Sequence, residues 1–207
     1  MKTKKQSFLA RAAMTLLLIV LTTATAWAQS NIGAITWNAT DQCYEIGSED
    51  ALEDLAVYVN RGTYSTGGTE YTSHNCQGMT FRLTADITMA KEHTAIGKEA
   101  SYSEYPFSGT FDGNNKKIIN LTINKSGSNN QGLFGLVKNG AVIKDLTLTN
   151  CNITGSNYVG GIVGSASGTE NNHSTIQNCH VSGNITGNNY VGGIAGGFWS
   201  YADITNS

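Results

Sequence analysis

The acidic residues of the C-terminal half are the first side chains to weigh for catalysis. Glycoside hydrolysis needs two carboxyl groups facing one cleft, and polysaccharide lyases generally add a Ca²⁺ site built from several carboxylates. From Phe107 onward the acids are Asp112, Asp145, Glu170 and Asp203. No two of them hold matching positions in successive repeats, so the sequence predicts no shared carboxylate face. A carbohydrate-active β-helix enzyme, lyase-like or hydrolase-like, is kept as an alternative.

Histidine and cysteine spacing gives no sign of a metal or cofactor site. The histidines are His74, His93, His173 and His180, and none is four residues from another. Neighbouring strand residues point to opposite faces, so Cys179 and His180 do not form a nucleophilic pair. The glycine-rich elements lack the Lys-Ser/Thr and following helix of a phosphate loop. The sequence therefore predicts no catalytic residue, no metal and no cofactor.

The four cysteines allow two interpretations. Cys43, Cys76, Cys151 and Cys179 have no CxxC spacing, so a zinc site is not indicated. An exported chain can oxidise its cysteines, and the pairs closest in sequence are Cys43 with Cys76 and Cys151 with Cys179. The alternative is that all four are small buried apolar residues.

Aromatic residues supply the candidate ligand contacts. Tyr158 and Tyr190 occupy equivalent positions in two repeats and are expected to stack on one another. They could form a strip that contacts sugar rings, together with Trp199 of a later aromatic cluster. The alternative, which we favour, is a structural stack beside the Gly-Gly corner.

An internal repeat sets the architecture that must position these residues. The segment 153–164 recurs at 185–196, an offset of about 32 residues of the kind that marks a repeat array. Within each unit apolar residues alternate with period two, which indicates strands near 141–148, 152–154 and 158–163. Gly and Asn clusters separate the strands as turns. Stacked units would bury one continuous apolar row, so we predict an all-β, right-handed parallel β-helix over residues 107–207.

The N-terminal residues have the layout of a signal peptide. A basic cluster precedes an apolar run at 12–21, and Ala26-Trp27-Ala28 provides small residues for cleavage after Ala28. Residues 1–28 are therefore predicted to be a signal peptide. Cleavage removes four of the 13 Lys and Arg residues from a chain of formal net charge −2. The exported chain carries no basic stripe, so nucleic acid is not a predicted partner.

Residues 29–106 are predicted to form an N-terminal capping region. Ser48 followed by Glu49 and Asp50 is typical of a helix start. Leu52, Leu55, Ala56 and Val59 then make one apolar stripe, which predicts a helix near 48–61. Such a helix can cover the open core of a first coil, as solenoids require.

The order of several short motifs resembles bacterial surface proteins that carry the GLUG motif. The motifs are Phe107-Ser108-Gly109-Thr110-Phe111-Asp112-Gly113, Ile119-Asn120-Leu121 and Gly132-Leu133-Phe134-Gly135. The resemblance implies a β-helical extracellular region, often within large adhesin-like proteins. Similar repeats occur in secreted peptidases that cleave immunoglobulin A, outside their catalytic domain. The resemblance supplies no catalytic residue.

We therefore expect a secreted or cell-surface, non-catalytic, adhesin-like repeat module for display or binding. The alternatives are the carbohydrate-active enzyme and a non-catalytic region of a larger secreted peptidase. The expected partners are host or matrix glycans or proteins, and the expected location is the outer surface of a Gram-negative bacterium. The final segment 202–207 begins another unit, so we also expect a longer chain, or self-association through this open coil.

Overall fold

The computed structural model describes residues 31–61, 64–66, 69–71, 75–100 and 103–207. The predicted signal peptide, residues 1–28, lies outside these described residues. Residues Ile32–Ser207 form one compact unit, a β-solenoid of about four turns with one helix. The predicted fold class is confirmed.

One large sheet runs through the unit along the stacking direction. Its path is β1-β2-β5-β9-β12-β15-β18, with β10 paired to β12 and β6 paired to β9. All of these pairs are parallel except β1 with β2. The strands of this sheet are β1 (Thr36–Asn38), β2 (Cys43–Ile46), β5 (Thr80–Leu83), β6 (Ile87–Thr88), β9 (Thr110–Ile119), β10 (Thr122–Asn124), β12 (Val142–Thr154), β15 (Ser174–Thr186) and β18 (Ala202–Thr205).

Two smaller parallel sheets form other faces of the coils. Two antiparallel hairpins are inserted in the chain, one after helix α2 (Glu49–Asn60) and one between β6 and β9. The parallel sheets are β11 (Phe134–Val137), β14 (Val163–Ala166) and β17 (Ala195–Phe198), and β13 (Asn157–Gly160) with β16 (Asn189–Gly192). The antiparallel hairpins are β3 (Tyr64–Thr66) with β4 (Thr69–Tyr71), and β7 (Lys98–Ala100) with β8 (Ser103–Tyr105).

The coil-to-coil register follows the sequence repeat. Ile153 pairs with Ile185, and Val159 pairs with Val191, as the 32-residue offset predicts. The segments expected near 141–148 and 152–154 are one strand, β12, which continues through a register shift between Leu148 and Cys151. The segment expected at 158–163 is instead divided into β13 and β14.

Glycine marks the corner that divides β13 from β14. A Cβ added at Gly160 would overlap the carbonyl oxygen of Val163, and one at Gly192 would overlap that of Ala195. The same close approach therefore recurs in successive coils. Only glycine tolerates it, which explains the first glycine of each repeated Gly-Gly pair.

The parallel pairing begins before the boundary drawn at residue 107. β2 pairs with β5, and β5 pairs with β9, in the same sheet as the repeats. The residues between 43 and 106 thus contribute coil strands as well as the cap. Their strands are short and irregular, which is why the repeat is not visible there in the sequence.

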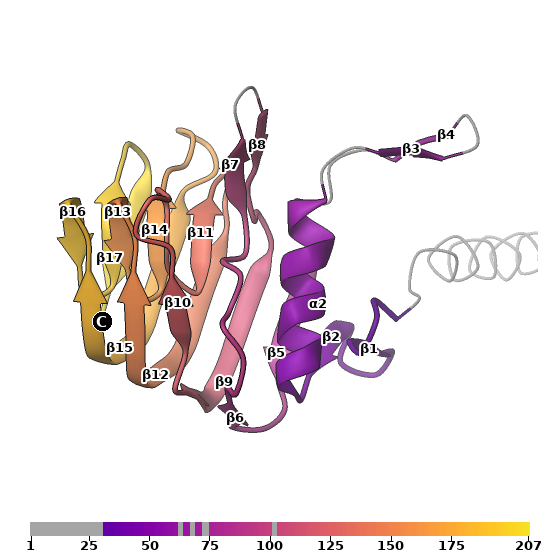
Figure 1. Cartoon of the computed structure of the whole chain (residues 1–207). Helices are drawn as coiled ribbons and strands as arrows, with labels where there is room; N and C mark the ends of the chain where they lie inside the picture. Colours follow the sequence, from indigo (N-terminus) through magenta and orange to yellow (C-terminus); the bar gives the residue numbers. More distant parts are fainter. Residues whose placement is uncertain (1–30, 62–63, 67–68, 72–74, 101–102) are drawn as a thin grey trace, which may run out of the picture. The chain divides into compact units, whose positions relative to one another are not determined.

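Helix α2 (Glu49–Asn60) is the one helix among the described residues, and it covers the β2–β5 end of the stack (Figure 1). The Ser48 side chain accepts a hydrogen bond from the Ala51 backbone N–H at 3.2 Å, and Glu49 and Asp50 lie in the first turn. The buried side chains of the helix are Ala51, Leu52, Leu55, Ala56 and Val59. The predicted helix and its apolar stripe are confirmed.

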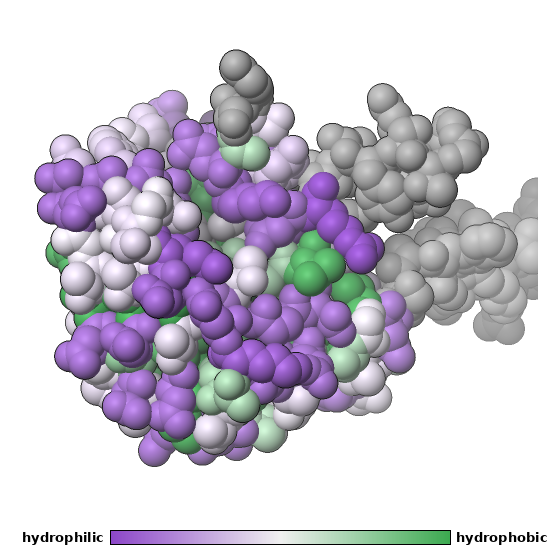
Figure 2. All heavy atoms as spheres, viewed as in Figure 1, coloured by the Kyte–Doolittle hydropathy of each residue, from purple (hydrophilic) through white to green (hydrophobic). Residues whose placement is uncertain are grey.

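The core is continuous from the cap into the coils. The Phe107 ring lies 5.0 Å from the Phe134 ring, which lies 5.2 Å from the Phe111 ring. Phe81 joins this group at 6.1 Å from Phe107, and Tyr44 stacks on Phe81 at 5.3 Å. Outside the core, the face shown in Figure 2 is mostly polar, with apolar side chains gathered only in small patches.

Candidate functional site

The two tyrosines predicted to share a position are stacked in the structure. The Tyr158 and Tyr190 rings have centroids 4.8 Å apart and an interplanar angle of 11°. The Trp199 ring lies 5.8 Å from Tyr158, and its Nε1 donates to Ser165 Oγ at 3.0 Å. Tyr190 is 61% exposed and Trp199 is 52% exposed.

This stack leaves only part of the aromatic surface open to a ligand. One face of Tyr158 is covered by Tyr190, and Trp199 is tilted against it. The contact that holds Trp199 to Ser165 is a structural hydrogen bond. The structure therefore fits the interpretation of a structural stack, and contact of these rings with a sugar stays a prediction.

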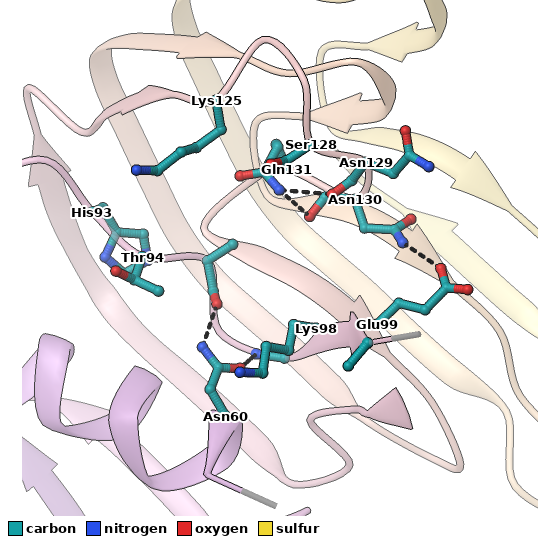
Figure 3. A pocket seen from close by; sticks show the side chains of 13 residues that line it. Asn60, His93, Thr94, Lys98, Glu99, Lys125, Ser128, Asn129, Asn130 and Gln131 are labelled. Atoms are coloured by element: carbon teal, nitrogen blue, oxygen red, sulfur yellow. Dashed lines mark hydrogen bonds between the residues drawn. The ribbon is translucent and has the colours of Figure 1, made fainter. Parts of the chain in front are cut away.

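A polar cleft of about 570 Å³ lies elsewhere on the unit, beside the C-terminal end of α2 (Figure 3). Its size is within the range of roughly 300–1,000 Å³ that is typical of small-molecule sites. Three segments line it, and amide, hydroxyl and charged side chains predominate. They are Asn60, residues 93–95 and 97–100, and Lys125 with residues 128–131.

One wall of the cleft is fixed by the last residue of the helix. Asn60 Nδ2 donates to the Ala95 carbonyl at 2.9 Å, and Asn60 Oδ1 accepts from the Gly97 N–H at 3.0 Å. Behind this wall, Ile96 donates to the Leu133 carbonyl at 3.0 Å and accepts from the Gly135 N–H at 2.8 Å. The segment 95–97 is therefore held between the cap and β11.

The opposite wall is fixed by the next coil. The Asn130 N–H donates to the Asn157 carbonyl at 2.9 Å, and the Ser156 N–H donates to the Ser128 carbonyl at 2.7 Å. Asn130 Nδ2 reaches across to Glu99 Oε2 at 3.1 Å, which joins this wall to β7. Both walls are thus held by hydrogen bonds, so the cleft is preformed.

No pattern in the sequence indicated this cleft. Its lining comes from irregular segments around 60, 93–100 and 125–131, which lie outside the clearest repeat. The one local feature of the lining that the sequence shows is the run of amide side chains in Ser128-Asn129-Asn130-Gln131. Amide clusters are also ordinary turn residues, so they do not identify a site on their own.

Two of the acids, Asp112 and Asp145, contact the same lysine although they do not hold matching positions in the register. Lys144 Nζ lies 3.1 Å from Asp112 Oδ2 and 3.2 Å from Asp145 Oδ2. Asp112 is in register with Lys144 across β9 and β12. Asp145 has a φ of 54°, and the register shifts between Lys144 and Leu146. This irregularity interrupts the regular alternation of side chains along β12 at Asp145.

The chemistry of this pair does not match a glycosidase. The hydrogen bond from Asn178, with help from Lys144, lowers the pKa of the Asp145 carboxyl below its ordinary value. A general acid needs a raised pKa so that it keeps its proton. Arg82 continues the row, 3.5 Å from Asp112 and 3.0 Å from Asp41. These charges form a ladder that links successive coils.

The remaining acids and histidines are separate from this ladder. His173 Nδ1 contacts Asp203 Oδ2 at 2.9 Å on the exposed surface, and Glu170 lies in the turn closed by the Thr169–Asn172 bridge. His180 is exposed, as predicted. Within the described ranges no group of three or more His, Cys, Asp or Glu side chains could hold a metal ion. His74 lies outside the described residues.

All four cysteines are buried thiols in the structure, which fits the second of the two interpretations, that of small buried residues. Cys151 pairs in register with Gly183, whereas Cys179 lies four residues earlier on β15 and pairs with Leu146. At about 3.3 Å per strand residue the two cysteines are about 13 Å apart. A disulfide needs Cα atoms within about 7 Å.

The other pair is separated by the two faces of a strand. Cys76 belongs to the hydrophobic core, together with the β2 side chains of Tyr44 and Ile46. Cys43 is in the same strand but is one residue from Tyr44, so it points away from that core. The charged groups near its thiol are Arg82, Asp41, Glu45 and Asp112. Cys43 and Cys76 are therefore close in sequence but lie on different sides of β2.

The fold and the register of its coils define the class of the protein as a capped β-solenoid built from repeats of about 30 residues. A family model for the M26 IgA1-specific metallo-endopeptidase N-terminal region matches residues 70–183. This match covers more than half of the chain, and the chain belongs to that family.

A curated relative agrees over a similar length. Halomucin of Haloquadratum walsbyi is 38% identical over 150 residues, which cover 68% of this chain and 2% of halomucin. The chain thus spans a small fraction of that relative. No solved structure matches the chain. In the described part of the chain, no helix is both long and apolar enough to span a membrane. The resemblance to GLUG-motif proteins stays a prediction.

Proposed function

We propose that this chain is a non-catalytic region of a larger secreted, peptidase-type protein, and that it serves as a rigid scaffold for display or binding. One observation carries the proposal: the family match, residues 70–183, runs from β4 into β15 and so coincides with the solenoid coils. The matched family is an N-terminal region of a peptidase by description. The alternative raised from the sequence is therefore better supported than a free-standing adhesin.

Two features of the coils support a scaffold role. The charge ladder through Arg82 and Lys144 and the stacked rings of Tyr158 and Tyr190 both join successive coils. Cross-coil contacts of this kind resist bending between coils, because each coil is fixed to its neighbour at several points. A rigid array can hold attached domains or ligands at a set distance.

The experiment is an incubation of the secreted chain with immunoglobulin A1, the substrate in the family's description. We expect intact heavy chains on gels after prolonged incubation, with and without added Zn²⁺. Heavy-chain cleavage that a chelator abolishes would overturn the non-catalytic assignment. Surface plasmon resonance on the same samples measures whether the chain binds immunoglobulin A1. Binding without cleavage is compatible with a non-catalytic scaffold.

Location and assembly belong to the same proposal. Export is supported by the leader-like residues 1–28 and by the family description. Location on the outer surface of a Gram-negative cell is checked by protease accessibility on intact cells. Self-association is proposed at the last described coil, where Val191, Phe198 and Ile204 are exposed. Light scattering should then show a concentration-dependent mass that Ile204→Lys abolishes.

A further inference from the structure

We propose that the polar cleft beside the end of α2 binds a neutral, hydroxyl-rich oligosaccharide. The first argument is the balance of charge around it. The lining contains two cations, Lys98 and Lys125, and one anion, Glu99. Lys125 is itself paired with Glu92 at 3.3 Å. With Glu92 counted, the cleft and its rim have two lysines and two glutamates, a balance that gives no advantage to a phosphate or a carboxylate.

The second argument is the mixture of donors and acceptors. Glu99 uses one oxygen to accept from Asn130, which leaves its second oxygen as an acceptor. The Lys98 ammonium and the Thr94 hydroxyl have no hydrogen bond to the described residues and supply donors on the facing wall. A sugar hydroxyl both donates and accepts, so it can use such a surface in a way that an anion or a cation cannot.

The third argument is that the walls are preformed, so binding orders little. Figure 3 shows Lys125 over one side of the cleft, with Asn60, Thr94 and Lys98 across from it. Asn60 clamps segment 95–97, and the facing segment is tied to the next coil. Polar ligands gain affinity when the protein does not lose conformational freedom on binding.

An aromatic ring lies near the edge of the cleft. Lys98 Nζ lies 5.6 Å from the centroid of the Tyr105 ring, on the paired strand β8. An aromatic ring beside polar groups can pack against the apolar face of a sugar while the polar groups bind its hydroxyls. Tyr105 does not line the cleft itself, but its ring lies beside the lining residue Lys98.

This inference deepens the proposed function, because it names a ligand class for a binding scaffold. The test is a glycan array of neutral microbial and host oligosaccharides, printed beside sialylated and sulfated forms of the same sugars. We expect the full chain to bind neutral sugars at least as well as their anionic forms. No binding, or binding only to the anionic forms, overturns the proposal. Neither result changes the outcome of the immunoglobulin cleavage assay, so the two proposals fail separately.

Variants then locate the binding site. Lys98→Gln and Glu99→Gln should each weaken the best neutral sugar by about three- to tenfold, the loss of one hydrogen bond. Ser128→Trp should block the cleft, because Ser128 lines it. The Ser128 side chain is exposed, so a larger side chain there does not enter the core. Lys117→Gln, an exposed lysine on β9 outside the cleft, is the matched control and should leave affinity unchanged. Circular dichroism checks that each variant is folded.

The aromatic stack is the competing site for a sugar on this chain. Tyr190→Ala and Trp199→Ala should leave binding intact if the cleft is the site. If these two variants abolish binding while Ser128→Trp does not, the cleft proposal is overturned. NMR chemical-shift changes with the same sugar should fall at residues 93–100 and 125–131.

Discussion

His93 Nδ1 lies 2.6 Å from Glu53 Oε1, and this contact joins the capping helix to the coil behind it. His93 Nε2 also lies 3.1 Å from the Leu133 carbonyl oxygen. A carbonyl oxygen only accepts, so Nε2 is the donor to Leu133, and Nδ1 faces the Glu53 carboxyl group. The His93 side chain is fully buried, while Glu53 is 24% exposed. The cap is therefore held by polar contact as well as by its apolar stripe.

Glu53→Gln should destabilise the protein, because it removes the charge that faces a buried imidazole. A hydrogen bond to a charged group contributes about 1.5–3 kcal/mol to stability, so we expect a loss of this order in the free energy of unfolding. Urea titration at neutral pH measures it. Asp50→Asn is the control, since Asp50 is on the same helix but pairs with Lys91 at the exposed surface. Equal stability of the two variants would show that the buried contact contributes nothing.

Asn157→Ala should destabilise the coils through the loss of a side-chain ladder. Asn157 Nδ2 donates to Asn129 Oδ1 at 3.0 Å, and Asn157 Oδ1 accepts from Asn189 Nδ2 at 2.8 Å. We expect a loss of about 1–2 kcal/mol for these two bonds. Urea titration is again the measurement.

Asn152→Ala is the matched control for the ladder. Asn152 is exposed and is in register with Asn184, but its side chain makes no hydrogen bond to the described residues. Its replacement should change stability little. A loss as large as that of Asn157→Ala would mean that the side-chain hydrogen bonds of the ladder are not the source of the stability.

The sequence predicted those features that repeat or depend on neighbours along the chain. Ser48, two acids and the apolar stripe of α2 are local signals, and the helix formed where they placed it. The equivalent positions of Tyr158 and Tyr190 followed from the 32-residue offset, and their rings do stack. In each case the residues that determine the feature lie within one short segment or recur at one fixed offset.

The features that the sequence missed depend on which coils and segments meet in space. Asp112 and Asp145 converge on Lys144 because of a local irregularity in β12, which a strictly alternating pattern cannot show. The cleft unites three segments that share no motif. The sequence could not decide between the two interpretations of the cysteines, because residues close in sequence lie on different faces, or at different heights, of the coils.

Phe134→Ala should be severely destabilising because the ring is fully buried between two others. Its centroid lies 5.0 Å from that of Phe107 and 5.2 Å from that of Phe111. A large-to-small change at such a core position costs about 3–5 kcal/mol. Thermal unfolding measures the loss, and Phe134→Leu is a milder variant in case the alanine form does not fold. Phe198→Ala, at a ring that is 37% exposed, should cost much less. Equal losses would contradict a core centred on Phe134.

The free energy of unfolding should fall above pH 9, and the buried Cys76 thiol should contribute to this fall along with Cys179, whose pKa burial raises to about 11. Burial raises the pKa of Cys76 from 9.0 to about 12. Between these values the unfolded chain has lost the thiol proton and the folded chain has kept it. The contribution of the protonated Cys76 thiol to the free energy of unfolding is therefore complete below pH 9. It declines as the pH rises toward 12, by about 1.4 kcal/mol per pH unit.

Cys76→Ala removes this contribution, together with the smaller effect by which Cys76 raises the pKa of Tyr58 and of Tyr44. Burial also raises the pKa of Tyr58 to about 12, but that residue is present in each. Urea titrations at pH 8, 9 and 10 should show a shallower decline with pH for Cys76→Ala than for the parent. Val59→Ala removes buried volume from α2 without removing a titrating group, so it should be less stable at every pH but keep the parent's slope. Parallel curves for the parent and Cys76→Ala would mean that the thiol proton is lost as easily in the folded chain as in the unfolded one.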